Sequence, residues 1–375
     1  MAGSSLVGEG PFRPGTGRLP PHLAGREAEQ NFFRTRITAM AEGVPPPNEV
    51  ILYGPRGNGK TVLLVWLQHE IARFRSLEAI RMTPSEIATR GQLAERLLPE
   101  AWWTGLTPEE VSVAGMAWRP GDKRRVPRAP DILAARARRK PLVLLLDEAH
   151  TLAPEVGQSL LNASQIVGSE LPFLLVLAGT PDLRHQLARM DASFWSRAHQ
   201  IPINRLSPTA SAAAIRRPLD EEDIEVDDSA LDRIVQESHG YPYFLQLWGS
   251  LVWQRAAGAG KRTIARAETE AARPEFDRRR GLYYLERFNE LEDRDLLGAA
   301  RAVAEAFVER PGLHHAELRE IVRSGLGDTA GPAQATDALR TLRHLGFIWQ
   351  SGADPRWEPG IPSLMDYIRE HAPAA

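Results

Sequence analysis

The sequence contains no cysteine. Without a thiol, the chain cannot form disulfide bonds, thiolate metal sites or a cysteine nucleophile. It also lacks any apolar run long enough to cross a bilayer. Its first residues, Met1 to Gly17, are rich in glycine, proline and serine but have no apolar segment of the kind found in signal peptides. We therefore expect a cytoplasmic protein with no membrane partner.

An excess of charge of one sign is missing as well. The chain has 46 lysines and arginines against 48 aspartates and glutamates, which gives a net charge of -2. This balance provides no global attraction to nucleic acid or to a membrane surface, so any such partner must be bound by a local patch. The length of 375 residues exceeds that of one ordinary core and predicts about two or three domains.

The most informative stretch is a glycine-rich loop that follows an apolar segment at 50–53 and precedes an apolar helix. Its spacing, G-x-x-x-x-G-K-T, allows backbone N–H groups to surround phosphate oxygens, because glycine tolerates unusual dihedral angles and adds no side chain. The following helix directs its positive end at the same phosphates. We expect Lys60 to reach the terminal phosphates and Thr61 to bind Mg²⁺. The residues predicted to contact nucleotide here are Gly54, Pro55, Arg56, Gly57, Asn58, Gly59, Lys60, Thr61 and Val62.

Two acidic residues follow the next apolar run, Pro141 to Leu146. A continuous apolar run is typical of a parallel strand that is buried on both faces, and ligands bind at the carboxyl ends of such strands. Asp147 is therefore placed to hold Mg²⁺ through its water shell. Glu148 is placed to orient or deprotonate an attacking water molecule, so we predict a catalytic role for it.

A third buried strand is predicted at 172–178, and Thr180 follows it. Thr180 has two interpretations. It could sense the terminal phosphate or the attacking water, or it could cap a helix that has Pro181 at its first position. Further strands are predicted at 77–82 and 200–206, and helices are predicted at 83–98 and 154–168. Buried strands that alternate with helix-sized segments indicate an α/β fold with a doubly wound parallel sheet.

Regular patterning fails between residues 99 and 130, where Trp102, Trp103 and Trp118 lie among glycines, prolines and charges. This composition indicates an insertion on the domain. The stretch 119–140 is strongly basic. It is either a solvated loop that leads into a basic helix, or a patch that binds nucleic-acid phosphates with tryptophans available for stacking.

After residue 206 the pattern becomes helical, and Trp248 and Trp253 are expected in the core of the first helices. The last part combines three helices with two short strands at 347–349 and 356–357, which is the pattern of a winged helix. The predicted helices are 208–217, 228–239, 241–257, 296–308, 315–325, 332–345 and 364–371.

Six motifs in this order resemble the AAA+ ATPases, in particular the branch with replication-initiator and transposition-regulator ATPases and STAND switch proteins. The motifs are L-A-G-R-E-A-E at 23–29, G-P-R-G-N-G-K-T at 54–61, L-V-L-L-L-D-E-A-H at 142–150, L-A-G-T-P-D-L at 177–183, F-W-S-R at 194–197 and G-Y-P-Y-F-L-Q at 240–246. The resemblance implies ATP/ADP and Mg²⁺ as cofactors. It implies that Gly25 and Arg26 lie against the adenine, that Thr180 is the first sensor, and that Arg197 is an arginine finger for a neighbouring subunit. A homo-oligomer is therefore expected.

Composition, patterning and the resemblance together predict four parts. These are a flexible segment at 1–20, a P-loop ATPase domain at 21–206 with an insertion at 99–130, an all-α lid domain at 207–275 and a winged-helix domain at 276–375.

One motif departs from the initiators. Where they carry a second-sensor arginine, this chain has Gly240, Tyr241 and Pro242, which resembles the glycine-x-proline module of STAND proteins. The resemblance implies that Pro242 contacts the nucleotide and that the lid and winged helix close on ADP and open with ATP. STAND proteins usually carry an effector on the same chain. Because this sequence shows none, a separately encoded effector protein is expected.

We therefore expect an ATP-hydrolysing molecular switch whose nucleotide state controls oligomerisation and the engagement of DNA or a partner protein. DNA would be bound through 119–140 and the winged helix. The alternative is a STAND-type regulatory module that gates a separate effector without binding DNA. The letters D-E-A-H at 147–150 also occur in helicases, but those need a second set of buried strands, and none follows residue 206.

Overall fold

The computed structural model describes residues 10–15, 17–47, 49–98, 128–190, 197–351 and 355–373. The chain divides into two compact units. One unit, which contains the main sheet, comprises Glu29–Tyr53 and Leu63–Ile201. The other, which is mostly helical, comprises the described residues of Met1–Ala28, Gly54–Val62 and Pro202–Ala375.

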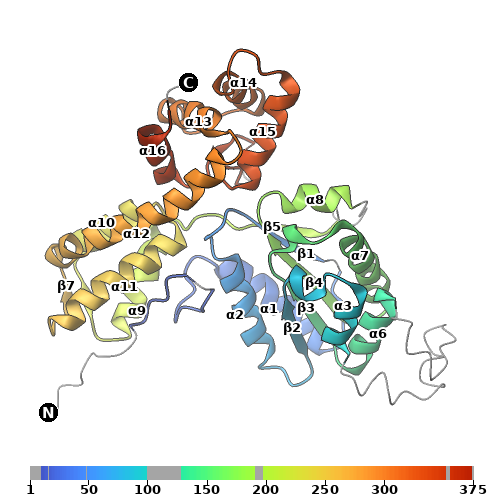
Figure 1. The fold of residues 1–375 in the computed structure, drawn as a ribbon. Coiled ribbons are helices and arrows are strands. Elements are labelled where there is room, and N and C mark those ends of the chain that lie inside the picture. The colour runs from blue at the N-terminus through green and yellow to red at the C-terminus, as the bar shows by residue number, and fades with distance from the viewer. Residues whose placement is uncertain are drawn as a thin grey trace, which may run out of the picture. The chain divides into compact units, whose positions relative to one another are not determined.

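The sheet unit is built on five strands, and the predicted doubly wound parallel sheet is confirmed (Figure 1). Neighbouring strands pair in parallel, with Val50 opposite Val176 and Leu142 opposite Phe173. The three central strands are buried at every residue, which explains their continuous apolar sequences. In spatial order the strands are β2 (Glu78–Met82), β3 (Leu142–Leu146), β4 (Phe173–Gly179), β1 (Val50–Tyr53) and β5 (His199–Pro202).

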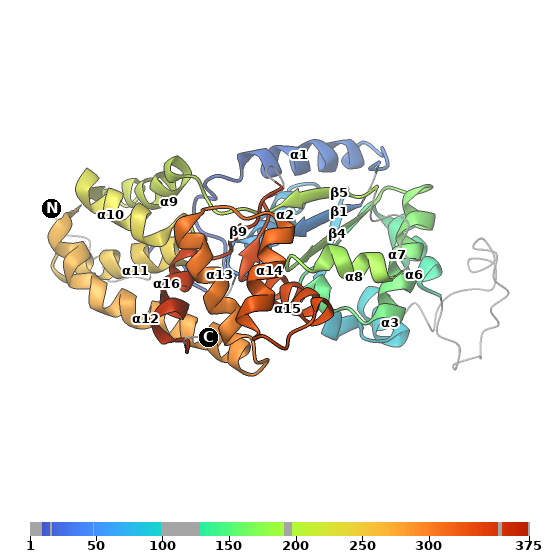
Figure 2. The same cartoon turned by 90° about the horizontal axis from the view of Figure 1, so that it is seen from above.

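Helices cover both faces of this sheet. On one face α1 (Glu27–Ala41) lies beside α2 (Lys60–Ile71), and on the other α6 (Ala129–Arg139) lies beside α7 (Pro154–Gly168), as Figure 2 shows from above. Contacts from Arg34 join the first two helices, with its guanidinium 3.3 Å from the Glu70 carboxylate and over the Trp66 ring. The other α-helices among the described residues of this unit are α3 (Arg90–Leu97) and α8 (Leu183–Arg189).

Around the sheet, two predicted elements differ from those observed. The helix expected over 83–98 is a 3₁₀ turn, η1 (Pro84–Ile87), followed by α3. The break arises because the Thr89 hydroxyl accepts a hydrogen bond from the N–H of Gln92 at 3.2 Å and starts a new helix there. The strand expected over 200–206 ends at Pro202, since proline has no N–H to continue a strand ladder.

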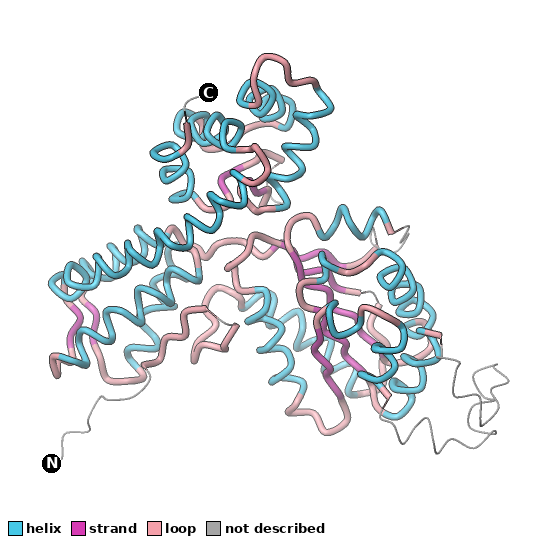
Figure 3. The backbone as a smooth tube through the Cα atoms, in the orientation of Figure 1, coloured by secondary structure: helices cyan, strands magenta, loops and turns pink. Residues whose placement is uncertain are grey.

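The second unit is mostly helical, with short strand pairs (Figure 3). Its helices agree with the predicted ones to within a few residues, except that α12 was not predicted. The second strand of the last pair is Glu358–Pro359, slightly later than the expected 356–357, and Trp357 forms an isolated bridge with Leu313 instead. The elements are α9 (Pro208–Asp220), β6 (Glu225–Val226), α10 (Asp228–Ser238), α11 (Pro242–Gly258), β7 (Thr263–Ile264), α12 (Arg266–Glu292), α13 (Leu297–Glu309), α14 (His315–Gly325), α15 (Pro332–His344), β8 (Ile348–Trp349), β9 (Glu358–Pro359) and α16 (Pro362–His371).

Helix α12 has 27 residues and is therefore roughly 40 Å long. It continues through Pro274 and across the position where the sequence suggested a border between lid and winged helix. The domain borders and the winged-helix assignment stay predictions. Within the part of the chain that the structure describes, no helix is both long enough and apolar enough to span a membrane.

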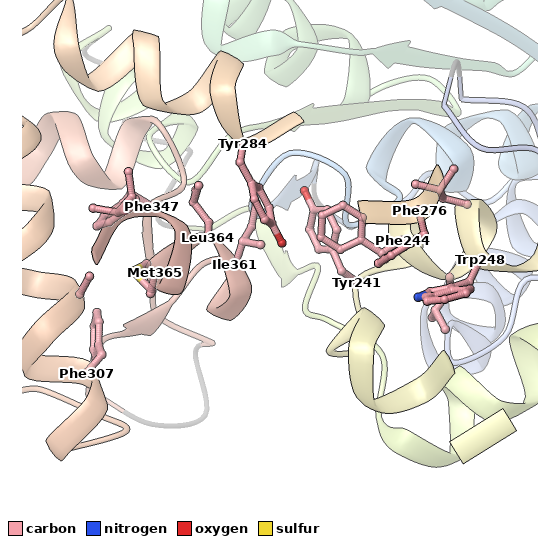
Figure 4. Close-up of a cluster of buried hydrophobic side chains, with 14 of the residues drawn as sticks. Tyr241, Phe244, Trp248, Phe276, Tyr284, Phe307, Phe347, Ile361, Leu364 and Met365 are labelled. Atoms are coloured by element: carbon pink, nitrogen blue, oxygen red, sulfur yellow. The ribbon is translucent and has the colours of Figure 1, made fainter. Parts of the chain in front are cut away.

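The core between α11 and α12 is aromatic (Figure 4). The Trp248 side chain is fully buried, and its ring stacks on that of Phe276 with 4.3 Å between centroids. Phe244 meets the same Phe276 ring edge to face. Trp253 is also buried, so the predicted placement of both tryptophans in this core is confirmed.

The N-terminal segment joins this core as well. The Phe12 ring is 4% exposed and occupies the space where a side chain on Gly249 would lie. Gly10 lies against the Trp253 indole, and the N–H of Arg13 donates to the Gln246 side chain at 2.8 Å. The expectation of a flexible segment over 1–20 therefore does not hold for residues 10–13. Because glycines and prolines surround Phe12, the sequence pattern did not indicate that its side chain is buried.

Replacing Phe12 with alanine is expected to lower the free energy of unfolding of the helical unit by about 3 kcal/mol, because it removes a buried ring and leaves a cavity. Urea titration followed by tryptophan fluorescence measures this loss. Leu282→Ala is the control, since Leu282 is 56% exposed and should change stability by less than about 0.5 kcal/mol. Equal effects of the two substitutions would show that Phe12 is not an anchor.

Candidate nucleotide-binding site

The loop at 54–61 has the backbone that its glycines predict. It leaves β1 after Tyr53 and ends where α2 begins at Lys60. Gly57 and Gly59 have φ angles of 82° and 90°, in the left-handed region that glycine adopts without strain. No described atom lies within 4 Å of the place where a side chain on Gly59 would start, so the loop is open on that side. Its backbone can therefore be approached closely by a ligand.

Lys60 and Asn58 fix this loop from within. The Lys60 side chain is buried, and its ammonium group donates to the carbonyl oxygens of Gly54 at 2.7 Å and Pro55 at 2.8 Å. The buried Asn58 amide donates to the carbonyl oxygen of Ile203 at 2.9 Å. The two following residues, Thr61 and Val62, are half-buried. Ile203, immediately after β5, thus holds the loop by accepting this hydrogen bond.

Arg26 joins the loop to the segment that precedes α1. Its guanidinium is 5% exposed and donates to the carbonyl oxygens of Asn58 at 3.0 Å and Asn204 at 2.5 Å. Gly25, the residue before it, has a φ angle of 66°. The structure thus brings Gly25 and Arg26 together with the phosphate loop. Their contact with adenine stays a prediction.

The module at 240–242 also reaches the loop, but through a residue for which the sequence suggested no role. Pro242 is half-buried and is the first residue of α11. Its neighbour Tyr241 is fully buried, and its hydroxyl donates to the carbonyl oxygen of Arg56. Burial raises the pKa of the Tyr241 phenol well above its ordinary value, so the hydroxyl keeps its proton. Tyr241 is therefore a hydrogen-bond donor to the phosphate loop.

In the sheet unit, polar residues gather at the carboxyl ends of neighbouring strands. Asp147 follows β3, and Thr180 follows β4. These strands are parallel, with Leu146 opposite Leu177, so both polar residues lie at the same edge of the sheet. Strand β1 ends at this edge too, because Tyr53 pairs with Gly179. The sheet therefore brings together the residues that were predicted to follow its buried strands.

Asp147 and Glu148 have different environments. The Asp147 carboxylate is buried, accepts from the N–H of Glu148 at 3.0 Å, and lies 3.7 Å from the Arg81 guanidinium. Glu148 has a φ angle of 50°, in a region that costs a non-glycine residue of order 1 kcal/mol or more. Its side chain is 47% exposed. Such strain is common at functional sites. Here it occurs at Glu148, whose accessible carboxylate lies next in sequence to the buried carboxylate of Asp147.

Thr180 is not a helix cap. Helix α8 begins at Leu183 with Asp182 as its capping residue, so the capping interpretation of Thr180 is wrong. The Thr180 side chain is 1% exposed, and its hydroxyl has no hydrogen-bond partner among the described residues. An orphaned buried hydroxyl fits a group that binds a ligand oxygen or water. The sensor role itself stays a prediction.

His150 connects Glu148 with Thr180, which sequence reasoning missed. Its Nδ1 atom lies 3.4 Å from both the Thr180 backbone nitrogen and the Glu148 carboxylate. One nitrogen can serve one of these at a time, as an acceptor when unprotonated or as a donor when protonated. The only signal was its place at the end of the D-E-A-H run. Arg81 was missed too, because its contact with Asp147 crosses between two strands.

Arg197 lies at the opposite edge of the sheet. It is exposed and lines a surface cavity of about 240 Å³ together with Glu49, the residue before β1, and Phe173, the first residue of β4. Strands β1 and β4 begin at this edge and end at the other. The structure therefore does not bring Arg197 together with Asp147, Glu148 and Thr180 of the same sheet.

Only part of the predicted basic patch is described. Residues 119–127 lie outside the described part of the chain, as do the tryptophans of the predicted insertion. In the remainder, Arg128 pairs with Asp131 at 3.3 Å, and Arg136 pairs with Glu78. These pairs neutralise the charges of Arg128, just before α6, and of Arg136 on α6. Nucleic-acid binding by 119–140 stays a prediction.

A family model described as an AAA domain matches residues 48–187. In addition, a stretch of 76 residues is 33% identical to the replication factor C large subunit of Thermofilum pendens. That stretch covers 20% of this chain and 17% of the relative, so the match spans less than a fifth of that protein. The family model thus covers the phosphate loop and most of the sheet.

Solved structures match nearly the whole chain. The ORC2 protein of Aeropyrum pernix, in its ADPNP–ADP complexes, is similar with a TM-score of 0.58 and 15% identity, over 94% of this chain and 96% of that one. Its ADP form gives the same TM-score and identity over 96% and 99%. At this identity the likeness shows a shared fold. Residues 48–187 are thus similar to an AAA domain, and the chain has the P-loop fold of the AAA+ ATPases.

Proposed function

We propose that this chain binds ATP with Mg²⁺ and hydrolyses it to ADP and phosphate, and that it acts as a molecular switch. The observation that carries this proposal is the conformation of the loop at 54–61. Gly57 and Gly59 are left-handed, Lys60 is held among loop carbonyl groups, and the loop runs straight into α2. Backbone N–H groups in such a loop, with a helix N-terminus behind them, suit phosphate oxygens.

The residues present fit Mg²⁺ and the attacking water. Thr61 and Asp147 offer the hard oxygen ligands that Mg²⁺ prefers, and the metal would neutralise charge on the phosphates. Glu148, accessible and strained, would orient or deprotonate the water. The orphaned Thr180 hydroxyl would bind the water or the terminal phosphate. Lys60 would exchange its carbonyl partners for phosphate oxygens.

The nucleotide base would meet residues outside the loop. Arg26, which follows Gly25, donates to the Asn58 carbonyl of the loop, and Pro242 is the first residue of α11, directly after Tyr241. These contacts support the proposal that Gly25 and Arg26 lie against the adenine and that Pro242 contacts the nucleotide. Their roles rest on the resemblance to AAA+ and STAND proteins.

Arg197 is proposed to act on the nucleotide of a neighbouring subunit, which requires a homo-oligomer. Its position at the amino edge of the sheet supports this role, because the predicted Mg²⁺ and water ligands lie at the carboxyl edge. An exposed arginine on the far edge of its own sheet is available to a second copy of the chain.

The target of the switch has two candidates. The first is DNA, bound through 119–140 and the predicted winged helix at 276–375. The second is a separately encoded effector protein that the chain gates without binding DNA. The charges favour the second: residues 311–375 hold six arginines and eight acidic residues. Three of these arginines pair with an acidic residue on their own helix, namely Arg323, Arg340 and Arg369.

Gel shifts with duplex and single-stranded DNA in ATP and in ADP, over a range of salt concentrations, would separate the candidates. A DNA-acting switch should bind in one nucleotide state, and its affinity should fall steeply with salt. If the chain binds no DNA in either nucleotide state, only the effector-gating candidate remains.

The substitution Lys60→Ala is expected to weaken ATP binding by about 10- to 100-fold, since it removes a charged donor to the terminal phosphates. Titration calorimetry with ATP and Mg²⁺ measures the loss. Lys140→Met, which removes a lysine at the end of α6, is the control and should bind as the unmodified protein does. If Lys60→Ala keeps full affinity, the loop is not the phosphate site.

A further inference from the structure

The turn at Arg56 and Gly57 is enclosed by a ring of interactions that no motif predicted. The Tyr241 hydroxyl donates to the Arg56 carbonyl oxygen and lies 2.8 Å from the Tyr283 hydroxyl. The Arg287 guanidinium lies over the Tyr283 ring, 5.1 Å from its centroid, and pairs with Glu290 at 3.0 Å. Glu290 pairs in turn with the Arg56 guanidinium at 3.2 Å. The ring thus starts and ends on the same loop residue.

We propose that Tyr241 is a positioning residue for the phosphate loop, which it holds in its binding conformation, and that Tyr283 on α12 orients it. This inference rests on the proposed function, because it assigns the loop to phosphate. It adds that α11 and α12 control the loop through one hydroxyl group. The interaction joins residues 185 positions apart in the chain.

The direction of each hydrogen bond follows from the chemistry. A carbonyl oxygen only accepts, so the single Tyr241 proton goes to Arg56. Tyr283 must then donate its own proton to the Tyr241 oxygen. Both bonds need protonated phenols, and the raised pKa of Tyr241 keeps its proton in place. The loop turn is therefore held by a directed chain of donors from α12.

Close packing explains why the hydroxyl is effective. A side chain on Gly57 would collide with the Tyr241 hydroxyl. The phenol group of Tyr241 is therefore packed directly against the loop at this left-handed glycine. Tyr241 is fully buried, whereas the Arg56 and Glu290 side chains are 40% and 27% exposed. A partly exposed ion pair contributes little compared with a hydrogen bond from a fully buried hydroxyl, whose loss leaves the carbonyl without this donor. Tyr241 is thus the main hold on the turn, and Glu290 assists.

The consequence concerns ligands that use the loop. ADP and ATP place phosphates against the loop N–H groups, whereas AMP has no β-phosphate to place there. Loosening the turn should therefore weaken ADP and leave AMP unchanged. Tyr284 offers a matched control (Figure 4). It lies on α12 next to Tyr283, is buried, and donates to the Ser363 hydroxyl at 2.5 Å instead of to the loop.

The experiment compares Tyr241→Phe, Tyr283→Phe and Tyr284→Phe in the full chain. Hydrogen exchange of the amides at 56–59 is measured without nucleotide, and dissociation constants are measured for ADP and AMP. Tyr241→Phe is expected to speed exchange and to weaken ADP by about five- to tenfold, the effect of one lost hydrogen bond, with AMP unchanged. Tyr283→Phe should show a smaller change of the same kind, and Tyr284→Phe should show none.

Two results would overturn the inference: equal effects of Tyr241→Phe and Tyr284→Phe, or unchanged loop exchange in Tyr241→Phe. A third result separates it from the proposed function. If the unmodified chain binds no ADP, the proposed function fails, while the exchange measurements still decide whether Tyr241 holds the loop.

Discussion

Replacing Arg197 with alanine is expected to lower ATP turnover by about 10³-fold or more while leaving ATP binding unchanged. An arginine finger stabilises charge that develops in the transition state and contributes little to binding of the ground state. Arg197 is exposed and lies at the amino edge of its sheet, so its loss should not disturb Asp147, Glu148 and Thr180 at the carboxyl edge. Steady-state phosphate release and titration calorimetry measure the two quantities.

A mixing experiment tests whether Arg197 acts on a neighbour. Arg197→Ala subunits retain Glu148, and Glu148→Gln subunits retain Arg197, so interfaces between the two variants can rebuild a complete site. Recovery of activity on mixing is the expected result. Arg138→Ala, which removes an exposed arginine on α6, is the control for loss of a surface charge. Unchanged turnover in Arg197→Ala would remove this residue from the site.

Replacing Glu148 with glutamine is expected to reduce turnover by about 10³-fold, within the range that a general base contributes, and to preserve ATP binding. Glutamine keeps the size of the side chain but cannot accept a proton from water. Single-turnover hydrolysis and nucleotide retention after gel filtration measure the effect. Glu155→Gln, at an exposed position in the first turn of α7, should hydrolyse ATP normally. Full activity of Glu148→Gln would exclude Glu148 as the base.

The Glu148→Gln variant also addresses the target of the switch. Because it should remain in the ATP state, a partner that recognises this state should stay bound during purification. A co-purifying protein would support the effector-gating candidate, and co-purifying nucleic acid would support DNA engagement. The gel shifts described above provide the independent check.

Some features could be predicted because their signal is local. The glycines and lysine of the loop at 54–61 are contiguous, and their conformational needs hold wherever the loop is placed. Strands β1, β3 and β4 are buried on both faces, so each is apolar throughout and recognisable alone. Because parallel strands end at a common edge, Asp147 and Thr180 could be expected together.

Other features were missed or misread where local signals were weak or contradictory. The charges of α12 and its internal Pro274 hid a 27-residue helix. Prolines and glycines around Phe12 suggested flexibility, although its ring is buried against Gly249. Thr180 before Pro181 suggested a cap, but the following helix starts later.

The sequence by itself determined the sheet, the phosphate loop and the strand ends that carry Asp147, Glu148 and Thr180. Only the tertiary structure showed which distant groups touch them: Arg81 beside Asp147, His150 between Glu148 and Thr180, and Tyr241 on the Arg56 carbonyl. The physical reason is that backbone conformation and burial follow from neighbours along the chain. Hydrogen bonds between residues 185 positions apart depend instead on how whole helices and strands pack.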